Sequence, residues 1–321
     1  MSLSKPPLWQ VALALAIVYV VWGSTYLAIR VAVEGLPPFL MAGGRWLAAA
    51  AILLVVGLVT RQPWPRPKEM AWAGLVGCFL LIGGNGLVVW AEQYISSGMA
   101  ALLVGSLPIW VLLLEAVIPD GARPTWLGSA GVALGMVGVA LLVWPSLMGG
   151  AGAALWAQGL VQLATILWAI GTLIGRRVSM PKSGVYNSAF QMVAAALGFV
   201  VISLAFGEPG RVEWAAVPRD AWLAWGYLVV FGSCIAFSAF AWLVQNVKPA
   251  LVSTYAYVNP AVAVVLGAWL LQEPVDAWTV AGAALVVASV ALVIQGGRPR
   301  PLTEDTRLPG VAGAPEAEDR G

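Results

Sequence analysis

The chain has 321 residues, of which 60% are hydrophobic and only 10% charged, and a formal net charge of +2. A mean hydropathy of +0.87 leaves too little polar surface for a water-soluble globule, so the composition predicts an integral membrane protein. The near-neutral charge excludes the basic surface typical of nucleic-acid-binding proteins. Because the chain has no histidine, imidazole metal ligands and histidine-dependent triads are excluded. Cys78 and Cys234 lie in apolar segments, so we predict no disulfide, metal site or cofactor.

The apolar segments are long enough to cross a membrane, which takes about 20 residues of helix. They lack the alternation of apolar and polar residues that is typical of strands. Division of the sequence at its Pro, Gly and charge clusters predicts an all-α fold with ten transmembrane helices. In chain order, these helices are predicted at residues 9–31, 38–59, 70–90, 98–118, 126–144, 153–175, 186–206, 220–243, 250–270 and 277–295.

Both ends of the chain are predicted to lie outside the membrane. Residues 1–8 lead into the first helix with no small-residue cleavage site after it, so we expect this helix to be retained rather than removed as a signal peptide. Residues 298–321 are rich in Pro, Gly and charge and are expected to form a disordered tail. Eleven Lys and Arg residues lie near helix ends on the side of the N-terminus and three on the other side, which predicts that both termini are cytoplasmic.

The two halves of the sequence match each other. A shift of 146 residues aligns Trp22 with Trp168, and a shift of 152 residues aligns Pro108 with Pro260. The six additional residues are expected in the loop between the seventh and eighth helices. Because each half has five helices, the second half enters the membrane in the opposite orientation. The sequence therefore predicts an inverted repeat, a plan common among secondary transporters that alternate access to a site near the membrane midplane.

Three segments carry a family resemblance: "WGSTYLAIRVAVEGLPPFLMAGGRWLAA", "GGNGLVVWAEQYISSGMAALL" and "LVSTYAYVNPAVAVVLGAWLLQEP". They resemble the repeats of the drug/metabolite transporter superfamily, EamA type, and in particular its bacterial inner-membrane exporters of amino acids and other metabolites. The resemblance covers about residues 9–295, with the first repeat expected over 9–146 and the second over 147–297. It implies a multi-pass protein of the bacterial inner membrane that moves a small molecule outward.

An aromatic face in the first helix is the leading candidate for a substrate site. Tyr19, Trp22 and Tyr26 are spaced by three and four residues, so they share one face of a helix. A tyrosine hydroxyl that faced lipid would have no hydrogen-bond partner, so this face is expected to look into the protein. The recurrence of Trp168 in the second repeat favours the wall of a substrate cavity, with a packed helix interface as the alternative.

Pro108 and Pro260 lie near the centres of the fourth and ninth helices, where a proline cannot donate a hydrogen bond and releases the carbonyl four residues before it. We predict that they act as hinges, with a purely architectural kink as the alternative. Asn85, between two glycines, suits either a ligand or tight packing. The predicted substrate-binding residues are Tyr19, Trp22, Tyr26, Asn85, Trp168, Thr172, Tyr255, Tyr257 and Asn259.

Two intramembrane charges, Arg45 and Glu115, are predicted to have structural roles. Arg45 is expected to extend toward the membrane surface or to bind an acidic residue, and Glu115 to pair with a basic one. The candidate partners are Glu34 or Glu92 for Arg45, and Arg123 or Arg176 for Glu115. Glycines in the fifth and tenth helices are expected to pack within one chain, which favours a monomer over a homodimer.

The residues favour a transporter over other membrane proteins. The motifs of metalloproteases, serine hydrolases and P-loop ATPases are all absent from the sequence, so neither an enzyme nor an ATP-driven pump is expected. The predicted helices have few central charges, which favours a neutral amino acid or related metabolite over a phosphate-bearing substrate. The alternatives are export of amphipathic drugs or other metabolites, and a membrane receptor or scaffold. The expected partners are the substrate and the lipid bilayer, without nucleic acid.

Overall fold

A computed structural model describes residues 6–118, 125–150, 152–246, 252 and 254–296. In these residues the secondary structure is entirely helical. Nine helices are long and apolar enough to cross a membrane, and Val258–Leu270 forms a shorter apolar helix in the described part. These ten apolar segments correspond to the ten predicted ones, so the prediction of an all-α membrane protein is confirmed. The predicted tail, 298–321, lies outside the described residues.

The ten segments are called helices one to ten here, and several of them consist of more than one element. The first half contains α1 (Leu8–Ile17), η1 (Val18–Trp22) and α2 (Gly23–Val33) in helix one; α3 (Pro38–Val59) as helix two; α4 (Pro67–Gly77), η2 (Cys78–Gly86) and α5 (Leu87–Ala91) in helix three; α6 (Ser97–Val104) and α7 (Leu107–Val117) in helix four; and α8 (Trp126–Met148) as helix five. The second half contains α9 (Gly152–Arg177) as helix six; α10 (Gly184–Ala205) as helix seven; the short turns η3 (Glu208–Arg211) and η4 (Trp214–Ala216); α11 (Arg219–Tyr227), η5 (Leu228–Ile235) and α12 (Ala236–Asn246) in helix eight; α14 (Tyr255–Leu270) in helix nine; and α15 (Ala277–Gly296) as helix ten.

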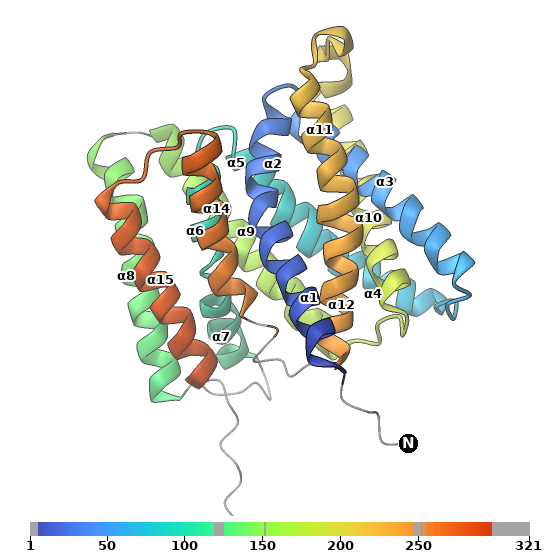
Figure 1. Ribbon diagram of the computed structural model, residues 1–321, viewed down its shortest axis with the longest axis horizontal. Helices are drawn as coiled ribbons and strands as arrows, with labels where there is room; N and C mark the ends of the chain where they lie inside the picture. Colours follow the sequence, from blue (N-terminus) through green and yellow to red (C-terminus); the bar gives the residue numbers. More distant parts are fainter. Residues whose placement is uncertain (1–5, 119–124, 151, 247–251, 253, 297–321) are drawn as a thin grey trace, which may run out of the picture.

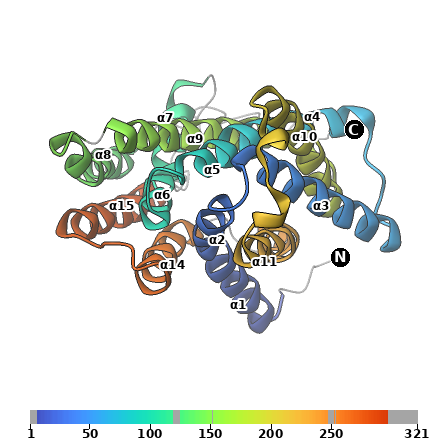
Figure 2. The ribbon, with the colours of Figure 1, turned by 90° about the horizontal axis from the view of Figure 1, so that it is seen from above.

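The packing of the helices has two-fold symmetry. Helix two packs on helix seven, four on nine, and five on ten, while one packs on eight and three on six. Exchange of helices one to five with helices six to ten leaves this set of pairs unchanged. Figure 1 shows α8 and α15 side by side, and Figure 2 places this pair and the α3–α10 pair at opposite ends of the molecule. The pairing is that of two structural repeats related by an axis between them.

Glycines bring helices five and ten into close contact within the chain. A Cβ atom on Gly138 would lie 2.9 Å from the backbone nitrogen of Val286, and one on Gly282 would lie 3.0 Å from the carbonyl oxygen of Gly138. Any larger side chain at these positions would force the two helices apart. The small residues of these helices are therefore used for packing inside the chain, as expected.

Helices three and eight, which are counterparts in the two repeats, both contain a π-helical stretch near their centres, η2 and η5. Helix one contains a third, η1, whereas its counterpart, helix six, is α-helical throughout. A π-helical stretch shifts the backbone bonding pattern and is common at functional sites. The sequence predicted uninterrupted helices here, and no Pro or Gly pattern distinguishes η1 from an ordinary helical turn.

The prediction that Pro108 lies inside a continuous helix is wrong. Helix four is divided at Gly105 and Ser106, and Pro108 lies in the first turn of α7, where its missing N–H would have no helical acceptor. Pro260, in contrast, lies inside α14 and is buried. A Cβ atom on Gly105 would lie 3.2 Å from Cγ of Pro260, so the break in helix four packs directly against the proline of helix nine.

Candidate functional site

A cavity of about 90 Å³ lies among helices one, two, three, four, six, eight and nine. Six of the nine predicted substrate-binding residues line it: Trp22, Tyr26, Asn85, Trp168, Tyr255 and Asn259. The sequence reasoning missed five further lining residues of polar or aromatic type: Thr25, Arg45, Trp46, Thr165 and Phe237.

Of the other three predicted residues, Tyr19 and Thr172 do not line the described cavity. The hydroxyl of Tyr19 is hydrogen-bonded to Oγ1 of Thr254. Thr172 donates its hydroxyl to the carbonyl oxygen of Trp168 at 2.9 Å, within its own helix. The side chain of Tyr257 lies outside the described residues. The hydroxyl of Tyr19 therefore bonds to a neighbouring segment and that of Thr172 to its own helix, and neither side chain forms part of the cavity wall.

Trp22 is held at the cavity by helix eight and helix nine. Its indole Nε1 donates to the carbonyl oxygen of Gly232 at 3.2 Å, in the π-helical stretch η5. Its ring centroid lies 5.3 Å from that of Phe237, 5.0 Å from that of Phe240 and 5.5 Å from that of Tyr255. Edge-to-face and tilted pairs at these distances are favourable. Trp22 therefore joins the first repeat to the second across the cavity.

Trp168 reaches the cavity because Gly84 leaves room for it. A Cβ atom on Gly84 would lie 2.7 Å from Cε3 of Trp168, which is closer than side-chain atoms can approach. Gly84 lies in η2 of helix three, beside Asn85. The glycine predicted to permit close approach thus accommodates an aromatic ring of the opposite repeat.

Arg45 lies in helix two with only 3% of its surface exposed. Its Nε donates to Oγ of Ser233 at 2.9 Å, and Cζ of its guanidinium lies 4.2 Å from the centroid of the Trp46 ring. Ser233, which lies in η5, in turn donates to the carbonyl oxygen of Leu228 at 2.9 Å. Among the described residues no carboxylate oxygen lies within 4 Å of its guanidinium, so the structure shows no ion pair of Arg45 with either Glu34 or Glu92.

The two asparagines of the cavity differ in their hydrogen bonding. Asn259, oriented so that its side-chain nitrogen faces the backbone, donates to the carbonyl oxygens of Tyr19 and Tyr255 at 3.3 Å and 3.2 Å. Asn85 has a buried Oδ1 without a hydrogen-bond partner, and Nη1 of Arg45 is likewise buried and unpaired. Nε1 of Trp46, in the same wall, is unpaired too. An unpaired buried polar atom is unfavourable, so these three atoms are candidates for a hydrogen bond to a ligand.

Glu115 lies away from the cavity, near the end of α7. Its Oε1 is 3.9 Å from Nη1 of Arg176, which is one of its two expected partners. The Arg176 side chain is 59% exposed and that of Glu115 is 27% exposed, so the pair contributes at most about 1 kcal/mol to stability. This geometry suits a contact between the helix ends.

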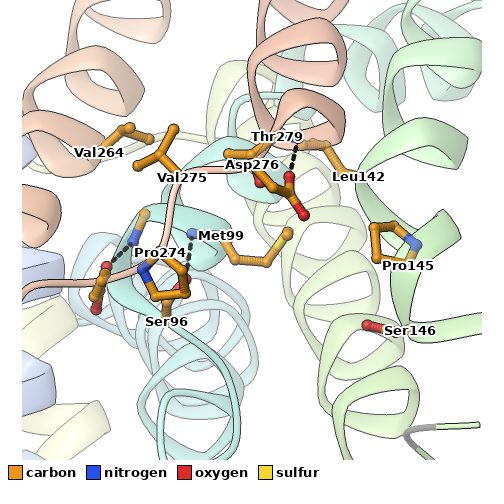
Figure 3. A pocket seen from close by; sticks show the side chains of 12 residues that line it. Ser96, Met99, Leu142, Pro145, Ser146, Val264, Pro274, Val275, Asp276 and Thr279 are labelled. Atoms are coloured by element: carbon orange, nitrogen blue, oxygen red, sulfur yellow. Dashed lines mark hydrogen bonds between the residues drawn. The ribbon is translucent and has the colours of Figure 1, made fainter. Parts of the chain in front are cut away.

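A second pocket lies at the N-terminal ends of α6 and α15 (Figure 3). Polar groups around it are occupied by helix capping: Ser96 accepts from the N–H of Met99 at 3.2 Å, and Asp276 accepts from the N–H of Thr279 at 2.7 Å. Glu273 accepts from the N–H and hydroxyl of Ser97 and from the N–H of Gly98. These satisfied bonds indicate a structural role. Among the described residues, no cluster of Cys, Asp and Glu could hold a metal ion.

Comparison with known proteins gives one consistent family. The EamA-like transporter family matches residues 9–144 and 155–295. The "Uncharacterized inner membrane transporter YedA" of Escherichia coli (strain K12) is 38% identical over 287 residues, which cover 88% of this chain and 90% of YedA. The "Probable terminal-alkyne amino-acid exporter" of Streptantibioticus cattleyicolor is 26% identical, covering 91% of this chain and 94% of that protein. A crystal structure 20% identical in sequence superimposes with a TM-score of 0.61 over 90% of this chain and shares its fold.

Proposed function

Because the chain belongs to the EamA-like transporter family, we propose that it exports small neutral amino acids or related metabolites across the cytoplasmic membrane. The proposal includes an inner-membrane location with both termini in the cytoplasm, and alternating access around the cavity. The observation that carries it is the cavity itself, whose aromatic walls come from both repeats and whose polar groups are few.

The chemistry of the lining fits such a substrate. Trp22 and Trp168 offer apolar surface for a hydrocarbon or thioether side chain, and Asn85 offers an amide for a polar group. The name of the Streptantibioticus cattleyicolor relative, an amino-acid exporter, supports the same substrate class. The symmetric helix pairs supply two halves that can rock against each other around a fixed site.

A substrate panel in proteoliposomes tests the proposal. Purified protein should exchange internal for external methionine, threonine and aromatic amino acids, with little discrimination, because one methylene in an apolar pocket changes binding by only about 1 to 3 kcal/mol. Each flux is measured with and without a pH gradient, which shows whether protons drive transport. Absence of flux for every neutral amino acid in folded protein would contradict the proposal.

Amphipathic drugs are a second candidate because the wall contains several aromatic rings besides Trp22 and Trp168, including Trp46 and Phe237. The same proteoliposomes distinguish the two classes. A drug substrate would inhibit amino-acid exchange and would itself be exchanged, whereas a compound that only partitions into the bilayer would do neither.

A further inference from the structure

The cavity wall contains a buried cation, Arg45, and no carboxylate oxygen of the described residues lies within 4 Å of it. We propose that Arg45 binds the carboxylate of the transported molecule, and that the substrate class is therefore free α-amino acids. This inference rests on the proposed function, which by itself requires only an apolar cavity with a few polar groups. It assigns a ligand to an arginine whose intramembrane position predicted a structural charge.

The guanidinium of Arg45 is held in a fixed position with one donor group unused. Nε is bonded to Ser233 of helix eight, and the plane of the group is supported by the ring of Trp46. Nη1 is buried without a hydrogen-bond partner, and Arg45 is part of the cavity wall. An arginine that is held by these contacts and keeps an unpaired Nη1 is prepared for a charge-assisted bond to a carboxylate, because little side-chain freedom is lost on binding.

The nearby acidic residue Glu92 makes no hydrogen bond or ion pair with the guanidinium of Arg45. Glu92 is fully buried, yet both of its carboxylate oxygens lack hydrogen-bond partners. The guanidinium of Arg30 donates to the backbone carbonyl of Glu92 at 2.5 Å, not to its side chain. Within the described part of the chain, no salt bridge involves Arg45. A substrate carboxylate would therefore supply an anion at a position where the described residues place none.

The same wall provides for the other end of an amino acid. The buried Oδ1 of Asn85 is an unpaired acceptor, and an α-ammonium group is a donor that would satisfy it. With the carboxylate at Arg45 and the ammonium at Asn85, the amino-acid side chain is left to the aromatic surface of Trp22 and Trp168. These complementary groups fit a zwitterion better than an uncharged amphipathic molecule.

Competition with matched analogues tests the inference. Wild-type proteoliposomes exchange radiolabelled methionine in the presence of unlabelled methionine, methioninamide or the decarboxylated amine. We expect the two analogues without a carboxylate to compete at least about tenfold more weakly than methionine, because charge-assisted bonds are lost. Arg45→Met should abolish this preference, and Arg45→Lys should retain part of it because the charge remains while the fork geometry does not.

Arg30→Met is the matched control, since it removes an arginine that does not line the cavity, and it should keep the preference for the carboxylate. Thermal unfolding of each variant in detergent identifies folded protein. If Arg45→Met does not fold, Arg45→Lys and the wild-type analogue series decide. Equal competition by methionine and methioninamide in the wild type, or an unchanged preference in folded Arg45→Met, would overturn the inference alone. Absence of flux for all neutral amino acids would overturn the proposed function as well.

Discussion

Helix two of the first repeat has an arginine where helix seven of the second repeat has a glutamine. Arg45 is separated by 146 residues, the offset of the repeat, from Gln191. Both side chains are buried, but Arg45 lines the cavity, whereas Gln191 donates to Oδ1 of Asn187 in its own helix at 3.1 Å. The repeats therefore share a backbone plan and differ in the chemistry that they direct at the cavity.

Helices three and eight repeat this contrast. The offset of 152 residues aligns Asn85 with Phe237, and both line the cavity. At these positions the first repeat thus supplies a guanidinium and an amide to the cavity, whereas the second supplies a ring opposite the amide and no group at the position of the guanidinium. A two-fold framework with an asymmetric lining can bind an asymmetric substrate in one orientation. Under the proposed function, duplication would preserve the alternating-access motion, and divergence of single side chains would set which substrate is bound.

The largest expected effect is a loss of flux on substitution of Trp22 or Trp168, the tryptophans at equivalent positions of the two repeats. Trp22→Ala and Trp168→Ala should each lower flux roughly tenfold or more, because a buried ring contributes about 1.5 to 3 kcal/mol to apolar contact. Trp22→Ala should also destabilise the protein more, because it loses the bond to Gly232 and three ring contacts. Flux in proteoliposomes and thermal unfolding measure the two effects. Trp22→Phe and Trp168→Phe are the controls that keep a ring. Undiminished flux in the double alanine variant would remove both tryptophans from the substrate path.

An intermediate effect is expected at the two prolines. Pro260→Ala supplies an N–H inside α14 that can bond to the carbonyl of Ala256, so helix nine should straighten and transport should slow several-fold with folding intact. Pro108→Ala should have little effect, because that residue lies in the first turn of α7. Initial rates of exchange measure the difference. Equal rates in both variants and the wild type would make Pro260 purely architectural.

The smallest effect concerns the N-termini of helices five and ten, where Thr125 and Asp276 each accept a hydrogen bond from the N–H three residues later. The N–H of Thr279 bonds to Asp276 and lowers the pKa of that carboxyl. A lowered folded-state pKa stabilises the protein above the unfolded-state pKa, and this contribution is lost as the pH falls through the folded-state value. Asp276→Asn should therefore reduce the loss of stability that occurs as the pH falls. The change should be less than about 1 kcal/mol, since the site is exposed. Thr125→Asn should leave the acid limb unchanged. Thermal unfolding between about pH 6 and pH 2.5 compares the variants, and parallel curves for Asp276→Asn and wild type would contradict this assignment.

The sequence was a good guide to the helices and a weaker one to their interruptions. Apolar length predicted the ten segments, because a helix in lipid must satisfy its own backbone. Rules for proline worked less well: α8 continues through Pro145 to Met148, beyond its predicted end at residue 144. The break at Gly105 packs against Pro260, a partner in the other repeat that local sequence cannot reveal.

The site shows the same division. Helix spacing and repeat symmetry singled out Trp22 and Trp168, both of which line the cavity. Arg45 stood out as an intramembrane charge, but its contact with Ser233 depends on η5, a backbone feature without a sequence signature. Phe237 gave no signal at all, because a phenylalanine in an apolar helix is ordinary.

Helix two has no side-chain cap of its own at its N-terminus, which begins with Pro38. Glu208, in the loop after helix seven, accepts hydrogen bonds from the N–H groups of Phe39 at 3.2 Å and Leu40 at 2.6 Å. The ribosome makes this carboxylate 169 residues after Phe39. During synthesis the first repeat therefore enters the membrane before the group that completes its second helix exists. Until Glu208 has been synthesised and packed against helix two, the N–H groups of Phe39 and Leu40 lack this acceptor.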